Sequence, residues 1–318
     1  VVRPPPSPYT GILAYWPWAT RNPGTGPLEQ SARGRSYGRQ STIGEVVKPS
    51  ARGPQPIDDP AFYDAHWRET STADDPHIAA KATLMTSLVP ADVRTIVDVG
   101  CGDGTLTHFF VERWQVTAVD RSAVALERLR CETVEASADA LPMADRSADL
   151  LMSSEMLEHL PDPVFAGAIA EMQRVAGSYL LLSVPDREDV RRRFARCSKC
   201  DHRFNVYGHL RSLGAADLER LFGDFERVSL HTCGPSEAAT FPRLEALRQG
   251  VARRWWMGAD VALRCPACGA TELKAPASGL AQRLVSRGID HLTRWGNRLL
   301  GRAPRPYWLV LLLRRRGV

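Results

Sequence analysis

The stretch VDVGCGDGTLTHFF, residues 97–110, constrains the fold more than any other part of this 318-residue chain. An apolar run ends at Gly100, glycines recur at Gly102 and Gly104, and apolar residues at helical spacing follow directly. Glycine allows a tight turn and a close approach of the backbone to a ligand. The start of a helix attracts anionic groups. This order predicts a strand, a turn and a helix that hold a ligand against the backbone.

The segments around this loop alternate between strand and helix signals, which indicates parallel βαβ units. Buried-strand runs occupy residues 95–100, 116–120, 133–137, 148–155, 178–184, 225–232 and 307–315. Helical spacing is found at 59–69, 76–89, 106–114, 123–130, 163–176 and 215–222. The sequence therefore predicts an α/β protein with a doubly wound, Rossmann-like sheet.

The spacing of the loop favours one class of cofactor over another. Asp120 ends the second strand, twenty residues after Gly100, where a carboxylate can accept hydrogen bonds from both hydroxyls of a ribose. A dinucleotide fingerprint needs a third glycine at position 105, which is Thr105 here. S-adenosylmethionine fits better, because it has no pyrophosphate and its cationic groups favour acidic neighbours such as Asp98 and Asp103.

These motifs resemble the class I S-adenosylmethionine-dependent methyltransferases of the type 11-like group, over roughly residues 60–232 and the last strand. The resemblance implies a seven-stranded sheet whose antiparallel last strand lies between strands five and six. It also implies a cofactor contact from SADALP after strand three and another from the fourth-strand segment SSEMLEHL. The implied cofactor-binding residues are Asp98, Gly100, Gly102, Gly104, Asp120, Asp139, Ala140 and Ser154.

The candidate catalytic residues Glu155, Glu158 and His159 follow strand four, at the edge of the sheet where ligands bind in such folds. Histidine is a usable general base near neutral pH. The segment also resembles the E-x-x-E-H stretch of quinone-ring O-methyltransferases, which is associated with a divalent metal or an acceptor phenol. A purely structural role is the alternative. Tyr63 and Trp67 either close over the ligands or serve as packing.

Two cysteine pairs, Cys197 with Cys200 and Cys265 with Cys268, have the spacing of zinc knuckles. Together they predict a four-thiolate structural zinc that joins two insertions into a cap over the acceptor pocket. His202 or His209 is an alternative ligand in place of one thiolate. A redox pair and unliganded cysteines are further alternatives.

Composition limits the partners. The net charge of +5 comes mainly from arginine in an Ala- and Gly-rich chain, which argues against nucleic acid without excluding it. Seven cysteines and the lack of a signal-peptide pattern predict a cytoplasmic protein. The apolar run at 307–313 is too short to span a membrane. The basic amphipathic stretch 279–302 predicts either packing on the domain or peripheral contact with a membrane.

The predicted organisation has six segments. It begins with a disordered Pro- and Gly-rich tail and ends with the last core strand, with two cysteine-bearing insertions between core segments; the boundaries are 1–57, 58–185, 186–213, 214–232, 233–305 and 306–318. The predicted function is methyl transfer, most simply to an oxygen of a small molecule or a glycan. RNA methylation and a non-catalytic binding module are the competing hypotheses.

Overall fold

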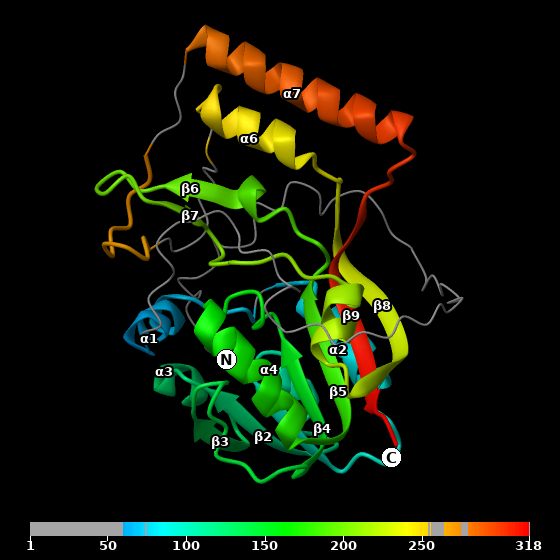
Figure 1. Ribbon diagram of the computed structural model, residues 1–318. Helices are drawn as coiled ribbons and strands as arrows, with labels where there is room; N and C mark the ends of the chain where they lie inside the picture. Colours follow the sequence, from blue (N-terminus) through cyan, green and yellow to red (C-terminus); the bar gives the residue numbers. More distant parts are fainter. Residues whose placement is uncertain (1–59, 74, 254, 256–263, 275–278, 318) are drawn as a thin grey trace, which may run out of the picture.

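The computed structural model describes residues 60–73, 75–253, 255, 264–274 and 279–317 (Figure 1). The predicted N-terminal tail, residues 1–57, lies outside these ranges.

A seven-stranded sheet forms the core, with the strand order β3-β2-β1-β4-β5-β9-β8. The first five strands are parallel, and β9 runs antiparallel between β5 and β8. The predicted α/β fold with an antiparallel last strand is therefore confirmed. The strands are β1 (Thr95–Val99), β2 (Gln115–Asp120), β3 (Glu132–Glu135), β4 (Ala148–Ser154), β5 (Ala176–Pro185), β8 (Phe225–Glu237) and β9 (Arg305–Arg315).

Helices cover both faces of the sheet, so its central strands read as continuous apolar runs. On one face, α4 (Asp162–Val175) and α5 (Ala215–Leu221) pack on alternate strand residues that include Leu311; on the other, α2 (Ile78–Ser87) packs on residues that include Leu312. Successive residues of β9 thus enter different cores, as the two-residue period of a strand requires.

Two of the predicted helices are shorter than their sequence pattern indicates. The segment 106–114 forms only a 3-10 turn at Thr107–Phe109, because bonds three residues back, such as the 2.9 Å bond from the Phe110 N–H to the carbonyl of Thr107, interrupt those four residues back, such as the 3.1 Å bond from Trp114 to Phe110. The segment 123–130 forms α3 (Ala123–Leu126), whose first turn is capped by the Ser122 hydroxyl. Helix α1 (Pro60–Glu69) precedes this core.

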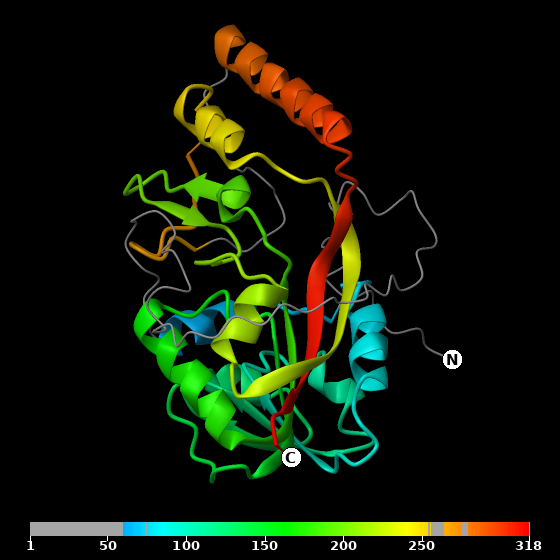
Figure 2. The same cartoon turned by 45° about the vertical axis from the view of Figure 1, so that its right-hand side comes forward.

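The two insertions form a cap beyond the carboxyl edge of the parallel strands (Figures 1 and 2). The first contributes a 3-10 turn (Val190–Arg193) and the hairpin of β6 (Phe194–Arg196) and β7 (Arg203–Asn205); the second contributes α6 (Pro242–Gly250) and α7 (Leu280–Leu299). Strands β8 and β9 extend toward the cap, where β8 leads into α6 and α7 leads into β9 (Figure 2). None of the helices in the described part of the chain combines the length and apolar character needed to cross a membrane.

Candidate active site

A cavity of about 1000 Å³ lies between the sheet edge and the cap. It is lined by α1, the glycine loop, the ends of β1 and β2, the segment after β4, the segment 136–138, the β6–β7 hairpin and one side of α6. The insertions therefore belong to the walls of the same cavity as the glycine loop.

The glycine loop reaches this cavity with a backbone that other residues rarely adopt. Gly100 and Gly102 both line it, with φ of +76° and +55°. A Cβ at Gly100 would lie 2.3 Å from Cγ of Met156, and one at Gly102 would lie 2.6 Å from the Trp67 ring. Gly104 also has a positive φ, but it faces Leu129 and does not line the cavity. Glycine is thus required at these positions by space as well as by conformation.

Asp120 joins the end of β2 to the glycine loop. Its Oδ2 accepts a 2.9 Å hydrogen bond from the N–H of Gly102, and its Oδ1 accepts one of 2.9 Å from the N–H of Ser122. The carboxylate lines the cavity and is 9% exposed. The carboxylate thus borders the cavity beside the glycine loop, and the ribose contact stays a prediction.

Asp98 and Asp103 act on the loop from outside the cavity lining. Asp98 is buried and accepts a 2.7 Å hydrogen bond from the Thr107 hydroxyl, and burial raises its pKa to about 7. Asp103 accepts hydrogen bonds from the hydroxyl of Ser71 and the N–H of Thr72, at 3.0 and 2.7 Å. These two carboxylates hold the loop and the segment after α1 in place.

The segment after β3 presents different residues from those that the family pattern implies. Ala136, Ser137 and Ala138 line the cavity, whereas Asp139 and Ala140 do not. Ser154, at the end of β4, is also outside the lining. Asp139 accepts a hydrogen bond from the Ser137 hydroxyl, which places it behind the wall of the cavity.

Glu155 is committed to an ion pair. Its Oε1 lies 2.9 Å from Nζ of Lys81, which is 1% exposed and sits 4.4 Å from the centre of the Trp308 ring. The Ser183 hydroxyl donates to the same oxygen at 3.1 Å. Glu155 has a φ of +55°, a strained conformation that turns the chain toward the cavity. Sequence reasoning missed Lys81, because a lone lysine in an apolar helix carries no motif.

Glu158, His159 and His209 form a cluster at the junction of core and cap. One ligand atom from each lies within 4.8 Å of those of the others. Glu158 is 1% exposed, and among the described residues neither of its carboxylate oxygens has a hydrogen-bond partner. His159 and His209 line the cavity, and Nε2 of His159 is 3.9 Å from Oε1 of Glu158. Such a group can bind a cation or a proton.

Burial shifts the pKa values of Glu158 and His159 in the directions that favour their neutral forms. Burial, and next the charge of Glu155, raises the pKa of Glu158 well above its usual value. Burial, and next the nearby His209, lowers the pKa of His159 well below its usual value. His159 is therefore a neutral imidazole at pH 7, the form that accepts a proton or binds a metal.

A buried charge network positions His209. Its Nδ1 contacts Glu188, which also pairs with Arg193, and Arg193 in turn pairs with Glu237 at the end of β8. The Arg193 guanidinium lies 5.0 Å from the centre of the Tyr207 ring. Because the carboxylate of Glu188 contacts Nδ1 of His209, the Nε2 atom of that ring points away from Glu188. Glu188 and Arg193 were missed because the pattern DREDVRRRF resembles a solvated charge run.

Helix α1 closes one side of the cavity with Tyr63 and Trp67. The helix is anchored to α3, because Asp64 accepts a 2.6 Å hydrogen bond from the Ser122 hydroxyl. Burial, and next the charge of Asp120, raises the pKa of Tyr63 to about 12, so its phenol stays protonated. The Trp67 ring lies against Gly102, and the Tyr63 ring lies 5.4 Å from the guanidinium of Arg121.

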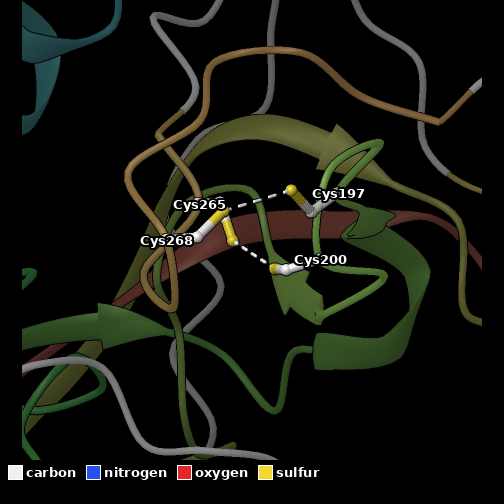
Figure 3. A group of neighbouring side chains, drawn as sticks. All are labelled: Cys197, Cys200, Cys265 and Cys268. Atoms are coloured by element: carbon white, nitrogen blue, oxygen red, sulfur yellow. Dashed lines mark hydrogen bonds between the residues drawn. The ribbon is translucent and has the colours of Figure 1, made fainter.

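The four predicted cysteines meet within the cap (Figure 3). Their sulfur atoms all lie within 4.8 Å of one another, with 3.6 Å from Cys197 to Cys268 and 3.6 Å from Cys200 to Cys265. Tetrahedral zinc with Zn–S bonds of about 2.3 Å separates its sulfurs by about 3.8 Å. Two of the sulfur pairs are thus close to the separation that a tetrahedral zinc site requires.

The backbone of the two knuckles is alike, although their sequences differ. Asp201 stands where glycine is usual and has a φ of +64°, close to the +69° of Gly269 in the second knuckle. Its carboxylate offsets this strain by pairing with Arg196 and, at 2.9 Å, with Lys274. His202 stacks on Phe204 and His209 belongs to the other cluster, so neither joins the four sulfurs.

Part of the core is similar to proteins of known family. Residues 96–178 match the family model described as a methyltransferase domain. A probable S-adenosylmethionine-dependent methyltransferase of Mycobacterium tuberculosis is 30% identical over 149 residues, which cover 44% of this chain and 51% of that protein. The ubiquinone biosynthesis O-methyltransferase of Serratia proteamaculans is 38% identical over 84 residues, 22% of this chain and 34% of that protein.

Among solved structures, a putative methyltransferase from Bacillus halodurans has a TM-score of 0.47 at 14% identity, covering 74% of this chain and 98% of that chain. The N-methyltransferase NodS from Bradyrhizobium japonicum, solved with S-adenosyl-L-homocysteine, has a TM-score of 0.46 at 13% identity, covering 81% and 98%. The chain spans about half the length of the mycobacterial relative. Residues 96–178 thus match a methyltransferase domain, and the strand order of the sheet is the one that the sequence resemblance implied.

Proposed function

We propose that the protein transfers a methyl group from S-adenosylmethionine to an oxygen of a small acceptor, with a glycan as the larger alternative. The observation that carries this proposal is the shared cavity, whose lining includes Gly100, Gly102 and Asp120 together with His159. When bound, S-adenosylmethionine supplies an electrophilic methyl group on a cationic sulfur.

The residues of the chain contribute position and a proton acceptor. Asp120 holds a ribose by its free lone pairs, and Tyr63 and Trp67 exclude water above the loop. His159 removes the proton from an acceptor hydroxyl, since its lowered pKa keeps the imidazole neutral. Oxygen is favoured as the methylated atom because an alcohol or phenol requires such a base.

The E-x-x-E-H stretch that this segment resembles is associated with a divalent metal or an acceptor phenol. The residues present fit a metal if His209 takes the place of Glu155 as a ligand. Glu155 is occupied by Lys81, whereas Glu158 has two buried oxygens that lack partners among the described residues. In this alternative Glu158, His159 and His209 would hold the cation, with Glu188 orienting His209, and His159 would be a ligand in place of the base, because a neutral imidazole has one free lone pair. A cation there would lower the pKa of an acceptor hydroxyl.

A test for the cation is independent of turnover. Titration of the protein with Mn²⁺, followed by electron paramagnetic resonance, should show a bound ion that Glu158→Gln weakens by about tenfold or more. The exposed Glu112→Gln is the control. An unchanged affinity in Glu158→Gln would leave His159 as a base without metal.

The four cysteines hold a structural zinc that pins the two insertions together. Two backbone hydrogen bonds between the insertions support this. The N–H of Ser198 donates to the carbonyl of Glu272 at 3.1 Å, and the N–H of Lys274 donates to the carbonyl of Arg196 at 2.7 Å. A four-thiolate zinc has no open coordination site, so its role is to shape the acceptor wall. The thiols must stay reduced, as expected in a cytoplasm.

Calorimetric titration with S-adenosylmethionine tests the function at its first step. The protein should bind it, and Asp120→Asn should weaken binding by roughly 10- to 100-fold through loss of a charged acceptor. The exposed Asp224→Asn is the matched control. Release of S-adenosylhomocysteine with phenolic acceptors then tests turnover. Absence of cofactor binding would favour a non-catalytic module, and turnover with RNA alone would refute the small-acceptor proposal.

A further inference from the structure

The long helix of the cap, α7, presents its apolar side outward. Its exposed apolar side chains form a stripe, and we call this set the α7 stripe: Leu280, Leu284, Leu292, Trp295 and Leu299 are 67%, 57%, 53%, 64% and 67% exposed. The buried residues of the same helix are Ser286, Ile289 and Asn297. The helix therefore packs through a narrow, mainly polar strip, and the described residues leave its most apolar surface uncovered.

Specific contacts fix this orientation. Arg248 of α6 lies 2.6 Å from Asp290 and donates to the Ser286 hydroxyl at 3.4 Å. The Asn297 amide donates to the carbonyl of Ala239 at 2.7 Å. In both overall views α7 is the outermost element, with α6 between it and the β6–β7 hairpin (Figures 1 and 2). The α7 stripe is thus exposed although the helix itself is held in place by these contacts.

Four arginines border the stripe along one side. At 100° per residue, Arg283, Arg287, Arg294 and Arg298 fall within one arc of about 60° next to the leucines. All four are exposed. Asp290 is the one acidic residue of α7, and it pairs with Arg248. A surface that covers the stripe must therefore also accept a row of uncompensated positive charge.

We propose that the α7 stripe binds the surface of a lipid bilayer that contains anionic headgroups. Leucine and tryptophan side chains enter the boundary between headgroups and acyl chains, and flanking arginines pair with phosphates. Tryptophan is enriched at this depth of a membrane. A second copy of the chain fits less well, since packing two stripes together brings two arginine rows near each other with no free carboxylate on α7 to match them.

Binding in this way would set the orientation of the cavity. Ala246, Gln249 and Gly250 of α6 line it, and α6 packs against α7. Adjacent helices lie about 8–10 Å apart. The cap wall of the cavity would then stand about one helix layer from the membrane. This inference concerns a surface and does not depend on methyl transfer.

Vesicle sedimentation with the full chain tests the proposal. The protein should sediment with vesicles of phosphatidylcholine and phosphatidylglycerol and remain unbound with phosphatidylcholine alone. The double variant Leu292→Ser, Trp295→Ser should weaken binding by about tenfold or more, because both side chains are exposed and only the membrane covers them. Arg287→Glu should weaken vesicle binding more at low salt than at high salt.

Matched controls come from exposed apolar residues of the core. Phe109→Ser and Val228→Ser, 42% and 52% exposed, should leave vesicle binding unchanged. Failure to bind either vesicle would overturn the proposal, and so would equal binding by the double variant. A concentration-dependent dimer that the double variant abolishes would overturn it too, by assigning the stripe to a second copy.

Discussion

The imidazole rings of His159 and His209 meet edge to face, with their centroids 4.7 Å apart and their planes at 83°. One ring comes from the segment after β4 and the other from the first insertion. The contact therefore joins the core to the cap within the cavity. It makes the chemistry at His159 sensitive to the position of the cap.

If His159 is the proton acceptor, as proposed, His159→Asn should reduce turnover by about 10²- to 10⁴-fold. Affinity for S-adenosylmethionine should change by less than about threefold, since Asp120 and the loop are unaltered. Steady-state kinetics and calorimetry separate these effects. His291→Asn, at an exposed position of α7, serves as the control. A loss of cofactor affinity equal to the loss of turnover would contradict the assignment.

The pH profile of the wild type supplies a related check. The pKa of His159 is lowered by burial, so protonation should stop catalysis only well below pH 6.5. Turnover should therefore persist as the pH falls through about 6.5. A decline centred on the ordinary histidine pKa would indicate that another group, or a more exposed His159, controls the rate.

Asp98→Asn should stabilise the fold at alkaline pH. The folded pKa of Asp98, about 7, lies above the usual 3.8, so the ionised form costs stability as the pH rises from about 4 to 7. Asparagine keeps an acceptor for the Thr107 hydroxyl and removes this cost. Urea unfolding at several pH values should show a gain over wild type that grows across this window. A constant difference at all pH values would argue against a raised pKa.

Cys265→Ser should remove the bound zinc, which elemental analysis of wild type should find at one ion per chain. Without the metal, amide hydrogen exchange should accelerate in β6 and β7, while cofactor affinity changes by less than about threefold. Cys131→Ser, outside the four-sulfur cluster, is the matched control. Wild-type protein that contains no zinc and a Cys265→Ser variant with unchanged exchange would together refute the structural zinc.

Gly102→Ala should destabilise the domain and weaken cofactor binding. Alanine at a φ of +55° costs about 1–2 kcal/mol, and its Cβ would displace the Trp67 ring. Gly288→Ala is the opposite control, because nothing lies within 4 Å of a Cβ there and helical alanine should add about 0.4–1 kcal/mol. Urea unfolding and calorimetry measure both effects.

Local patterns predicted the sheet well and the two helices after β1 and β2 poorly. Apolar runs such as 307–315 are long and buried on both faces, so their pattern has one interpretation. The segment 106–114 also has helical spacing, but its turns tighten into i to i−3 bonds around Phe110. Spacing alone does not distinguish these two kinds of turn.

The sequence predicted those parts of the candidate site that depend on short motifs. It did not predict the pairs of side chains that are far apart in the chain. Gly100, Gly102 and the cysteine pairs carry short-range signals that the chain displays directly. The pairing of Lys81 with Glu155, 74 positions apart, and of Glu188 with His209 depends on how the insertions fold over the core. The α7 stripe was visible as an amphipathic pattern, but its outward direction depends on contacts with α6.

The place of β9 in the sheet has a consequence for how the protein matures. Strand β9 supplies the pairing partner of both β5 and β8, yet it consists of residues 305–315, after the whole cap. During synthesis the first five strands can pair in order, whereas β8 must wait for β9 to separate it from β5. The residues of the cap are therefore synthesised before the strand that completes the sheet, so the cap cannot be held in its final position over the core until β9 has paired with β5 and β8.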